Sequence, residues 1–127
     1  MNNADLMLKA TTALSSAELL LQAGDTDGAC NRAYYAMFDA SRAVLLTMGA
    51  VDDLSSVKTH SGLITAFGLH VVKPGMVLPE LGKSLNKVED LRLVADYRGD
   101  EVTDEQAQWA LEQAHTFVLE MQRLIER

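Results

Sequence analysis

Two stretches of this chain decide its fold: NRAYYAMFDASRAVLL at residues 31–46 and LRLVADY at residues 91–97. The first combines two tyrosines, a phenylalanine and two arginines with small and apolar residues, which is typical of a helix that packs on most sides. The second places Arg92, Asp96 and Tyr97 within about one helical turn of each other. An arginine on an apolar helix needs a partner for its charge, so both stretches raise the question of what their polar side chains bind.

The spacing of apolar residues predicts helices throughout the chain and no strand. We expect five helices, which begin and end near residues 4–23, 28–48, 55–71, 79–98 and 103–125. The second is apolar almost all round and is expected at the centre of the core. The sequence therefore predicts an all-α fold, a single-domain helical bundle over residues 1–127 with long helices joined by short turns.

Residues suited to helix ends support these boundaries. Asp27 suits the N-cap of the second helix, and Ser55 or Ser56 suits the N-cap of the third. Pro79 suits the first turn of the fourth helix, which Gly99 and Asp100 terminate. Thr103 with Gln106 forms a capping-box pattern at the start of the fifth helix.

Composition narrows the class of protein. The chain of 127 residues is 48% hydrophobic and 23% charged, with a formal net charge of −7. That profile predicts a globular domain, and the charge disfavours a broad surface that binds nucleic-acid phosphates. RNA contact would need a local cationic site or a partner. The sequence has no apolar run that could span a bilayer and no evident signal peptide, and its one cysteine excludes an internal disulfide. We therefore expect a cytoplasmic protein without a membrane segment.

Arg92 has two interpretations. Asp96 lies four residues further along the helix and can form an ion pair with it, with Tyr97 packed at the helix end. We favour this structural interpretation. The alternative is a polar site at the end of the fourth helix, in which the Arg92 guanidinium forks onto a phosphate.

The second helix carries a similar ambiguity. Arg32 and Arg42 flank Tyr35 and Asp39 on one face, so Asp39 can pair with either arginine. We interpret this face as an ion-pair ladder at a contact between helices or subunits rather than as a catalytic site.

Lys58, Thr59 and His60 are expected at the start of the third helix, where a lysine and a histidine could receive an anion. A capping or surface role for His60 is the favoured alternative. Glu112 and His115 form a Glu-x-x-His pair, but a di-iron site needs a second such pair and two further glutamates. We therefore predict no metal site and no cofactor.

Three motifs, RAYYAMFDASRAVLL, KTHSGLI at 58–64 and LRLVADY, occur in an order that resembles the HEPN domains, and the resemblance covers nearly the whole chain. In particular, the chain is similar to small stand-alone prokaryotic HEPN proteins. The resemblance implies a four-helix up-and-down core, a homodimer, and a partner nucleotidyltransferase in a pair of toxin–antitoxin type.

Active members of the family are metal-independent ribonucleases that use an arginine followed after four to six residues by a histidine. Arg92 matches the arginine, but no histidine follows it at that spacing. The leading hypothesis is therefore a dimeric partner module without the usual catalytic histidine, in which Arg92, Asp96 and Tyr97 form a polar cleft. Lys58, Arg32 and Asp39 are further candidate binding residues. The alternative is a ribonuclease toxin in which Arg92 acts with His60 or Tyr97.

Overall fold

The computed structural model describes residues 1–51, 55–97, 99 and 101–126 of the chain. Those residues form five α-helices and two short helical turns, and no strand occurs among them. The helices are α1 (Asn3–Gln22), α2 (Thr26–Thr47), α3 (His60–Phe67), α4 (Pro79–Tyr97) and α5 (Asp104–Glu126), with a 3₁₀ turn η1 (Ser55–Val57) before α3 and a π-helical turn η2 (Gly68–Val72) after it. The predicted all-α class is confirmed.

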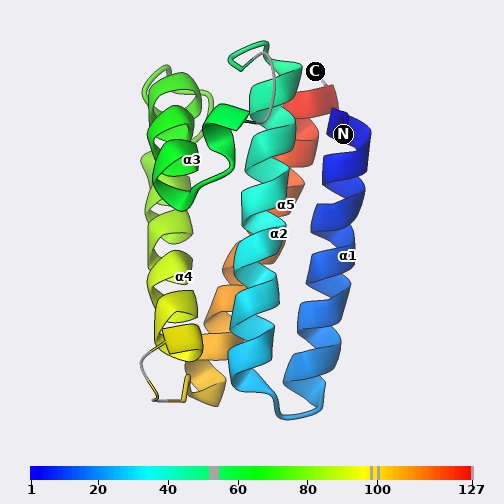
Figure 1. Cartoon of the computed structure of the whole chain (residues 1–127), viewed down its shortest axis with the longest axis vertical. Helices are drawn as coiled ribbons and strands as arrows, with labels where there is room; N and C mark the ends of the chain where they lie inside the picture. Colours follow the sequence, from blue (N-terminus) through cyan, green and yellow to red (C-terminus); the bar gives the residue numbers. More distant parts are fainter. Residues whose placement is uncertain (52–54, 98, 100, 127) are drawn as a thin grey trace.

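The four long helices α1, α2, α4 and α5 run alternately up and down, and both ends of the chain lie at the same end of the bundle (Figure 1). The short helix α3 packs beside α2 and α4 at that end, so it lies outside the four-helix core. Because α2 contacts α1, α4, α5 and α3, it is the central element of the fold.

Small side chains allow α2 this central position. Along α1 and α2, alanines occupy many of the buried positions, so the two helix backbones approach closely. The buried alanines are Ala10, Ala13 and Ala17 of α1 and Ala29, Ala33, Ala36, Ala40 and Ala43 of α2. Larger buried side chains such as Tyr34, Met37 and Leu45 fill the space toward the other helices.

Helix ends were predicted with mixed success. Pro79 opens α4, and Thr103 and Gln106 form the expected capping box of α5. The N-cap of α2 is Asp25, whose Oδ1 accepts a hydrogen bond from the Gly28 N–H, so the prediction of Asp27 was wrong. Asp27 instead accepts a hydrogen bond from the backbone N–H of Val102, far away in the sequence.

The third helix also begins later than predicted. Ser55 and Ser56 lie in η1, and the N-cap of α3 is Thr59, whose hydroxyl accepts from the Gly62 N–H. The α-helix ends at Phe67, and the chain continues as the π-helical turn η2.

The fourth helix ends at Tyr97, and Gly99 has a positive φ of 76°, as a residue that terminates a helix often does. Asp100, the other predicted terminator, lies outside the described residues. None of the helices in the described part of the chain is long and apolar enough to cross a membrane.

The inward face of α4 is not wholly apolar. Leu85 and Val88 are buried, whereas Leu81, Leu91 and Ala95 are only partly buried. Three polar side chains, Ser84, Glu89 and Arg92, take buried positions instead. The core therefore contains charge on α4, and that charge defines the candidate site.

Two glycine substitutions test the cap of α2. A Cβ on Gly28 would lie 2.8 Å from Cγ of Asp25 and displace the capping carboxylate, whereas a Cβ on Gly68 meets nothing within 4 Å. We expect Gly28→Ala to lower the free energy of unfolding by about 1 kcal/mol through loss of the cap. Gly68→Ala should raise it by about 0.5 kcal/mol because its backbone is helical. Urea denaturation measures both, and stabilisation by Gly28→Ala would contradict the assigned cap.

Candidate functional site

Arg92 is the centre of the site and is almost completely buried, with 2% of its surface exposed. Its guanidinium makes a forked contact with Glu89, in which Nε donates to Oε2 at 2.9 Å and Nη2 to Oε1 at 3.0 Å. Nη1 donates to Oδ2 of Asp96 at 2.9 Å. The predicted Arg92–Asp96 ion pair is therefore present, and a second pair with Glu89 accompanies it.

His60 reaches the same guanidinium from another helix. As the first residue of α3, it points its ring toward α2 and α4, and its Nε2 lies 3.0 Å from Nη2 of Arg92. Because a guanidinium only donates hydrogen bonds, Nε2 is the acceptor, and the ring carries its proton on Nδ1. Nδ1 then donates to the hydroxyl oxygen of Tyr34 at 2.7 Å.

Tyr34 closes this chain of contacts. Its hydroxyl donates to the Glu89 carboxylate, and its ring is fully buried on α2. Burial, together with the negative charge of Glu89, raises the pKa of Tyr34 well above its usual range. The hydrogen bond to Glu89 likewise raises the pKa of Arg92, against the effect of burial. Arg92 is therefore a permanent cation and Tyr34 a neutral donor. We call Tyr34, His60, Glu89, Arg92 and Asp96 the Arg92 cluster.

Aromatic rings enclose the guanidinium. Its carbon lies 5.3 Å from the ring centroid of Tyr34, 5.6 Å from that of Tyr35 and 5.9 Å from that of Tyr97. Such contacts stabilise a cation through the electron-rich ring faces. Tyr97 is 74% exposed, so it covers Arg92 on the solvent side.

A polar link extends from Asp96 to Arg32. The side-chain amide of Asn31 donates to Asp96 at 3.1 Å, and the Asn31 carbonyl oxygen accepts from Nε and Nη2 of Arg32. The Arg32 guanidinium also lies 5.3 Å from the ring centroid of Tyr35. Arg32 is therefore joined to the Arg92 cluster through one side chain, and Asp39, one of whose two possible partners was Arg32, is not involved.

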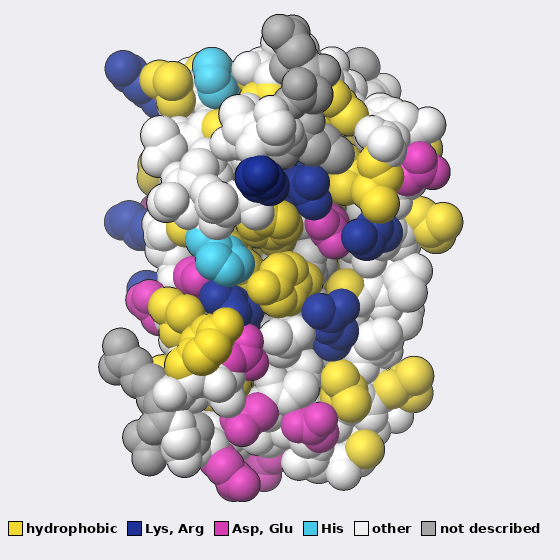
Figure 2. Space-filling view, in the orientation of Figure 1, with side chains coloured by type: hydrophobic (Ala, Val, Ile, Leu, Met, Phe, Trp, Pro, Cys, Tyr) yellow, Lys and Arg dark blue, Asp and Glu magenta, His cyan; other side chains and the backbone are white. Residues whose placement is uncertain are grey.

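Asp39 and Lys58 lie apart from this link. Asp39 is buried on α2 and pairs with Arg42 at 3.3 Å, which is one of the two pairings expected for it. Burial raises the pKa of Asp39, although Lys9 and Arg42 act in the opposite direction. Lys58 is exposed just before α3. On the face formed by α2, α3 and α4, basic, acidic, histidine and hydrophobic side chains gather together (Figure 2).

Within the described part of the chain, no group of three His, Cys, Asp or Glu side chains is arranged so that it could hold a metal ion. His115 pairs with Glu18 of α1. Cys30 is fully buried in the core.

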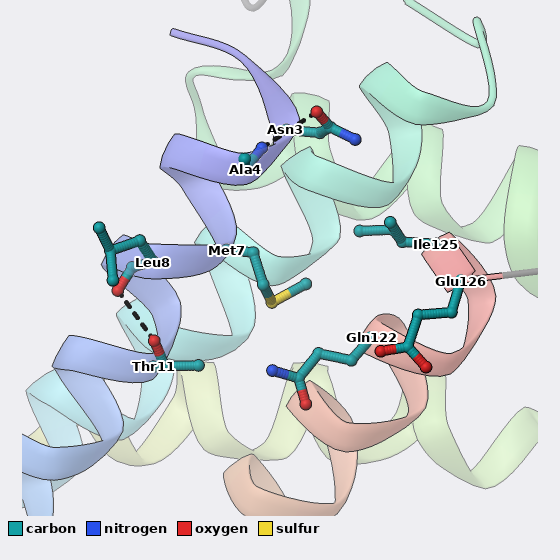
Figure 3. A pocket seen from close by; sticks show the side chains of 8 residues that line it. All are labelled: Asn3, Ala4, Met7, Leu8, Thr11, Gln122, Ile125 and Glu126. Carbon is teal, nitrogen blue, oxygen red and sulfur yellow. Dashed lines mark hydrogen bonds between the residues drawn. The ribbon is translucent and has the colours of Figure 1, made fainter.

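A separate pocket lies between the first turns of α1 and the last turns of α5 (Figure 3). Met7, Leu8 and Ile125 give it an apolar wall, and Gln122 and Glu126 lie at its edge. No arginine, lysine or histidine occurs among the described residues that line it. This pocket therefore offers little acid–base chemistry, and the Arg92 cluster is the candidate site.

Three residues of the site were missed at the level of sequence: Glu89, Tyr34 in its polar role, and Asn31. Glu89 had a visible signal, because it precedes Arg92 by three residues on a helix. The Tyr34–His60 contact had none, since it depends on how α3 packs against α2.

The fold and the site define an α-helical bundle with a buried arginine that contacts a histidine from a neighbouring helix. Residues 4–124 match the HEPN domain. The chain therefore belongs to the HEPN family, as its motifs suggested.

Several relatives are similar over most of their length. The chain is 36% identical over 105 residues to "Putative toxin MJ0605" of Methanocaldococcus jannaschii, an alignment covering 83% of this chain and 75% of that protein. It is 40% identical over 95 residues to the UPF0332 protein glr0978 of Gloeobacter violaceus, covering 75% and 71%. A UPF0332 protein of Thermotoga maritima is 36% identical over 120 residues, covering 93% and 86%.

Removal of Arg92 should destabilise the fold. Arg92→Ala leaves the buried Glu89 without its cation, and we expect a loss of about 3–5 kcal/mol. The double variant Arg92→Met/Glu89→Gln leaves no buried charge at these two positions and should recover a large part of the loss. Thermal and urea unfolding measure both variants.

A matched control is available on α5. Arg123 and Glu120 have the same spacing as Arg92 and Glu89, but their pair is exposed. Arg123→Ala should cost less than about 1 kcal/mol. Equal losses for Arg92→Ala and Arg123→Ala would contradict the importance of the buried pair.

Cys30 should be unreactive in the folded protein. Burial, with smaller effects from Asp27 and Asp96, raises its pKa to about 11. At pH 8 the Cys30 thiol would be ionised in only about one molecule in a thousand. Iodoacetamide should therefore label Cys30 quickly in urea and very slowly in buffer. The folded protein retains the thiol proton, so stability should fall as the pH rises from about 9 toward 11. Rapid native labelling at pH 8 would refute this.

Proposed function

We propose that this chain is the HEPN component of a two-protein system of toxin–antitoxin type, and that it acts there as a dimeric binding module for a nucleotidyltransferase. The toxin–antitoxin context is supported by the HEPN family and by the name of the M. jannaschii relative. The partnership with a nucleotidyltransferase and the dimer rest on what is usual for stand-alone HEPN proteins.

The observation that carries the proposal of a binding role is that most N–H donors of Arg92 already have partners within the protein. Four of the five N–H groups of a guanidinium are engaged here, by Glu89, Asp96 and His60. A phosphate could fork onto Arg92 only if a carboxylate moved away, and at 2% exposure the guanidinium is hardly accessible. Arg92 therefore serves better as a fixed centre of the fold than as a phosphate ligand.

Charge supports the same conclusion. Within the Arg92 cluster one cation faces two carboxylates, because His60 is neutral when it accepts from Arg92. The whole chain has a net charge of −7. An RNA phosphate would therefore approach a site with excess negative charge, which opposes binding.

A second candidate function is a metal-independent ribonuclease, and one observation favours it. His60 contacts Arg92 at 3.0 Å, and its side chain is 36% exposed. An imidazole supplied by α3 would replace the missing histidine of α4 as the general base for a ribose 2′-hydroxyl. Nε2 would first have to leave Arg92, since that nitrogen is already an acceptor in the resting structure. Tyr97 is the exposed alternative to His60 in this role.

Partner binding can be tested directly. The tagged protein, expressed in its natural host, should elute at the size of a dimer and retain a protein that carries a nucleotidyltransferase domain. The partner is identified by mass spectrometry. A strict monomer that retains no nucleotidyltransferase would contradict the proposal.

Cleavage of RNA separates the two candidates. We expect the purified protein to leave single-stranded and hairpin RNA intact on denaturing gels. The variants for comparison are His60→Ala and, as a matched control, His70→Ala, because His70 is a partly exposed histidine outside the Arg92 cluster, as His60 is a partly exposed one within it. Cleavage that is lost with His60→Ala and kept with His70→Ala would establish the ribonuclease. Cleavage that is equal in all three would come from another source.

A further inference from the structure

Trp109 is the only tryptophan in the chain, and it lies partly buried in the second turn of α5. Three hollows of the surface share it as a lining residue. They lie along α5, which runs behind α2 in the view of Figure 1. None of their described lining residues belongs to the Arg92 cluster. We call the surface around these hollows the Trp109 surface.

The hollow on the α1 side of Trp109 has a volume of about 480 Å³ and is acidic. Asp104, Glu105 and Glu112 line it, together with Leu21 and Gln108, and no basic residue occurs among its described lining. The three carboxylates are exposed, so their charge faces solvent or a ligand.

Helix stability explains only part of this acidity. Asp104 and Glu105 belong to the first turn of α5, where negative side chains stabilise the helix dipole. Glu112 lies two turns further on, beyond the reach of that effect, and its one hydrogen bond comes from the neutral amide of Gln108. An aromatic ring beside three carboxylates is an environment that favours a cation.

The hollow on the α4 side has a different character. Leu91 and Val94 form its apolar wall against Trp109, and its volume is about 340 Å³. Both side chains are only partly buried, although they pack on the core. Lys87 and Asp90 complete its lining. The third hollow, further toward the start of α4, shares Lys87 and adds Glu80 and Lys83. Across the Trp109 surface the lining therefore changes from acidic, through an apolar wall with one lysine and one aspartate beside it, to a hollow where two lysines face one glutamate.

We propose that the Trp109 surface docks a basic, amphipathic segment of a partner protein. An arginine or lysine of that segment occupies the acidic hollow against Trp109, and a neighbouring apolar side chain enters the hollow lined by Leu91 and Val94. Lys83 and Lys87 disfavour a second cation at the far end, so they fix the direction of the segment. This inference does not depend on the role of the Arg92 cluster, which lies around α2, α3 and the other side of α4.

Because Trp109 is the only tryptophan, its fluorescence reports binding at this surface alone. The probe is a helical peptide of about 15 residues, long enough to form helix, with leucines and arginines on one face and no tryptophan. We expect a saturable shift of the emission to shorter wavelength as the ring loses water. A peptide with glutamates in place of the arginines should give no shift.

Two charge reversals on α5 distinguish a specific site from general attraction to an acidic protein. Glu112→Lys alters the acidic hollow. Glu120→Lys makes the same change in net charge at a position about 12 Å further along the helix, where Glu120 pairs with Arg123. Glu112→Lys should weaken the peptide about tenfold or more, and Glu120→Lys should leave the affinity within about twofold. Circular dichroism confirms that both variants fold. Equal weakening by both variants, equal binding of the glutamate peptide, or no saturable shift would each overturn the proposal.

Discussion

The buried ion pair of Glu89 and Arg92 is the constraint on which the rest of this structure depends. Both residues lie on the inward face of α4, where a bundle of this size would ordinarily place apolar side chains. Charges taken out of water are costly unless they are paired and hydrogen-bonded. The helices around α4 must therefore supply polar partners at fixed positions. Tyr34 does so from α2 and His60 from α3.

This requirement connects the packing of the bundle with the chemistry of its surface. His60 is partly buried, and its ring accepts from Arg92 on one nitrogen and donates to Tyr34 on the other. The short helix α3 is thus held by a polar contact as well as by Leu63 and Phe67 in the core. The candidate site and the attachment of α3 are consequently one feature of the molecule.

The sequence predicted the helices because their apolar residues recur with the period of a helix, most clearly in α1, α2 and α5. It predicted the ends less well. The run GDTDG contains two aspartates that could cap α2, and which of them does so depends on a tertiary contact between Asp27 and Val102. A contact across most of the chain leaves no local signal. The start of α3 was missed for a different reason, because Thr59 caps it locally and Ser55 or Ser56 was expected to do so.

The site too was predicted where contacts are local and missed where they join separate helices. The Arg92–Asp96 pair and the missed Arg92–Glu89 pair both follow from spacing along one helix. His60 was a candidate as an anion ligand at the start of the third helix and as a replacement for the histidine missing after Arg92. No pattern in the sequence indicated Tyr34 as its partner. Asp39 paired with Arg42, three residues further along the helix, rather than with Arg32, seven residues before it. Local spacing thus predicted pairs within a helix, whereas pairs between helices needed the packed bundle.

The interlocking of Tyr34, His60, Glu89 and Arg92 also limits how such a chain can evolve. A single substitution at Arg92 leaves an orphaned carboxylate in the core, and one at Glu89 leaves an orphaned guanidinium. Either intermediate would be purged before a second change could repair it. Divergence at this centre therefore requires nearly simultaneous replacements, so the four positions form one epistatic unit.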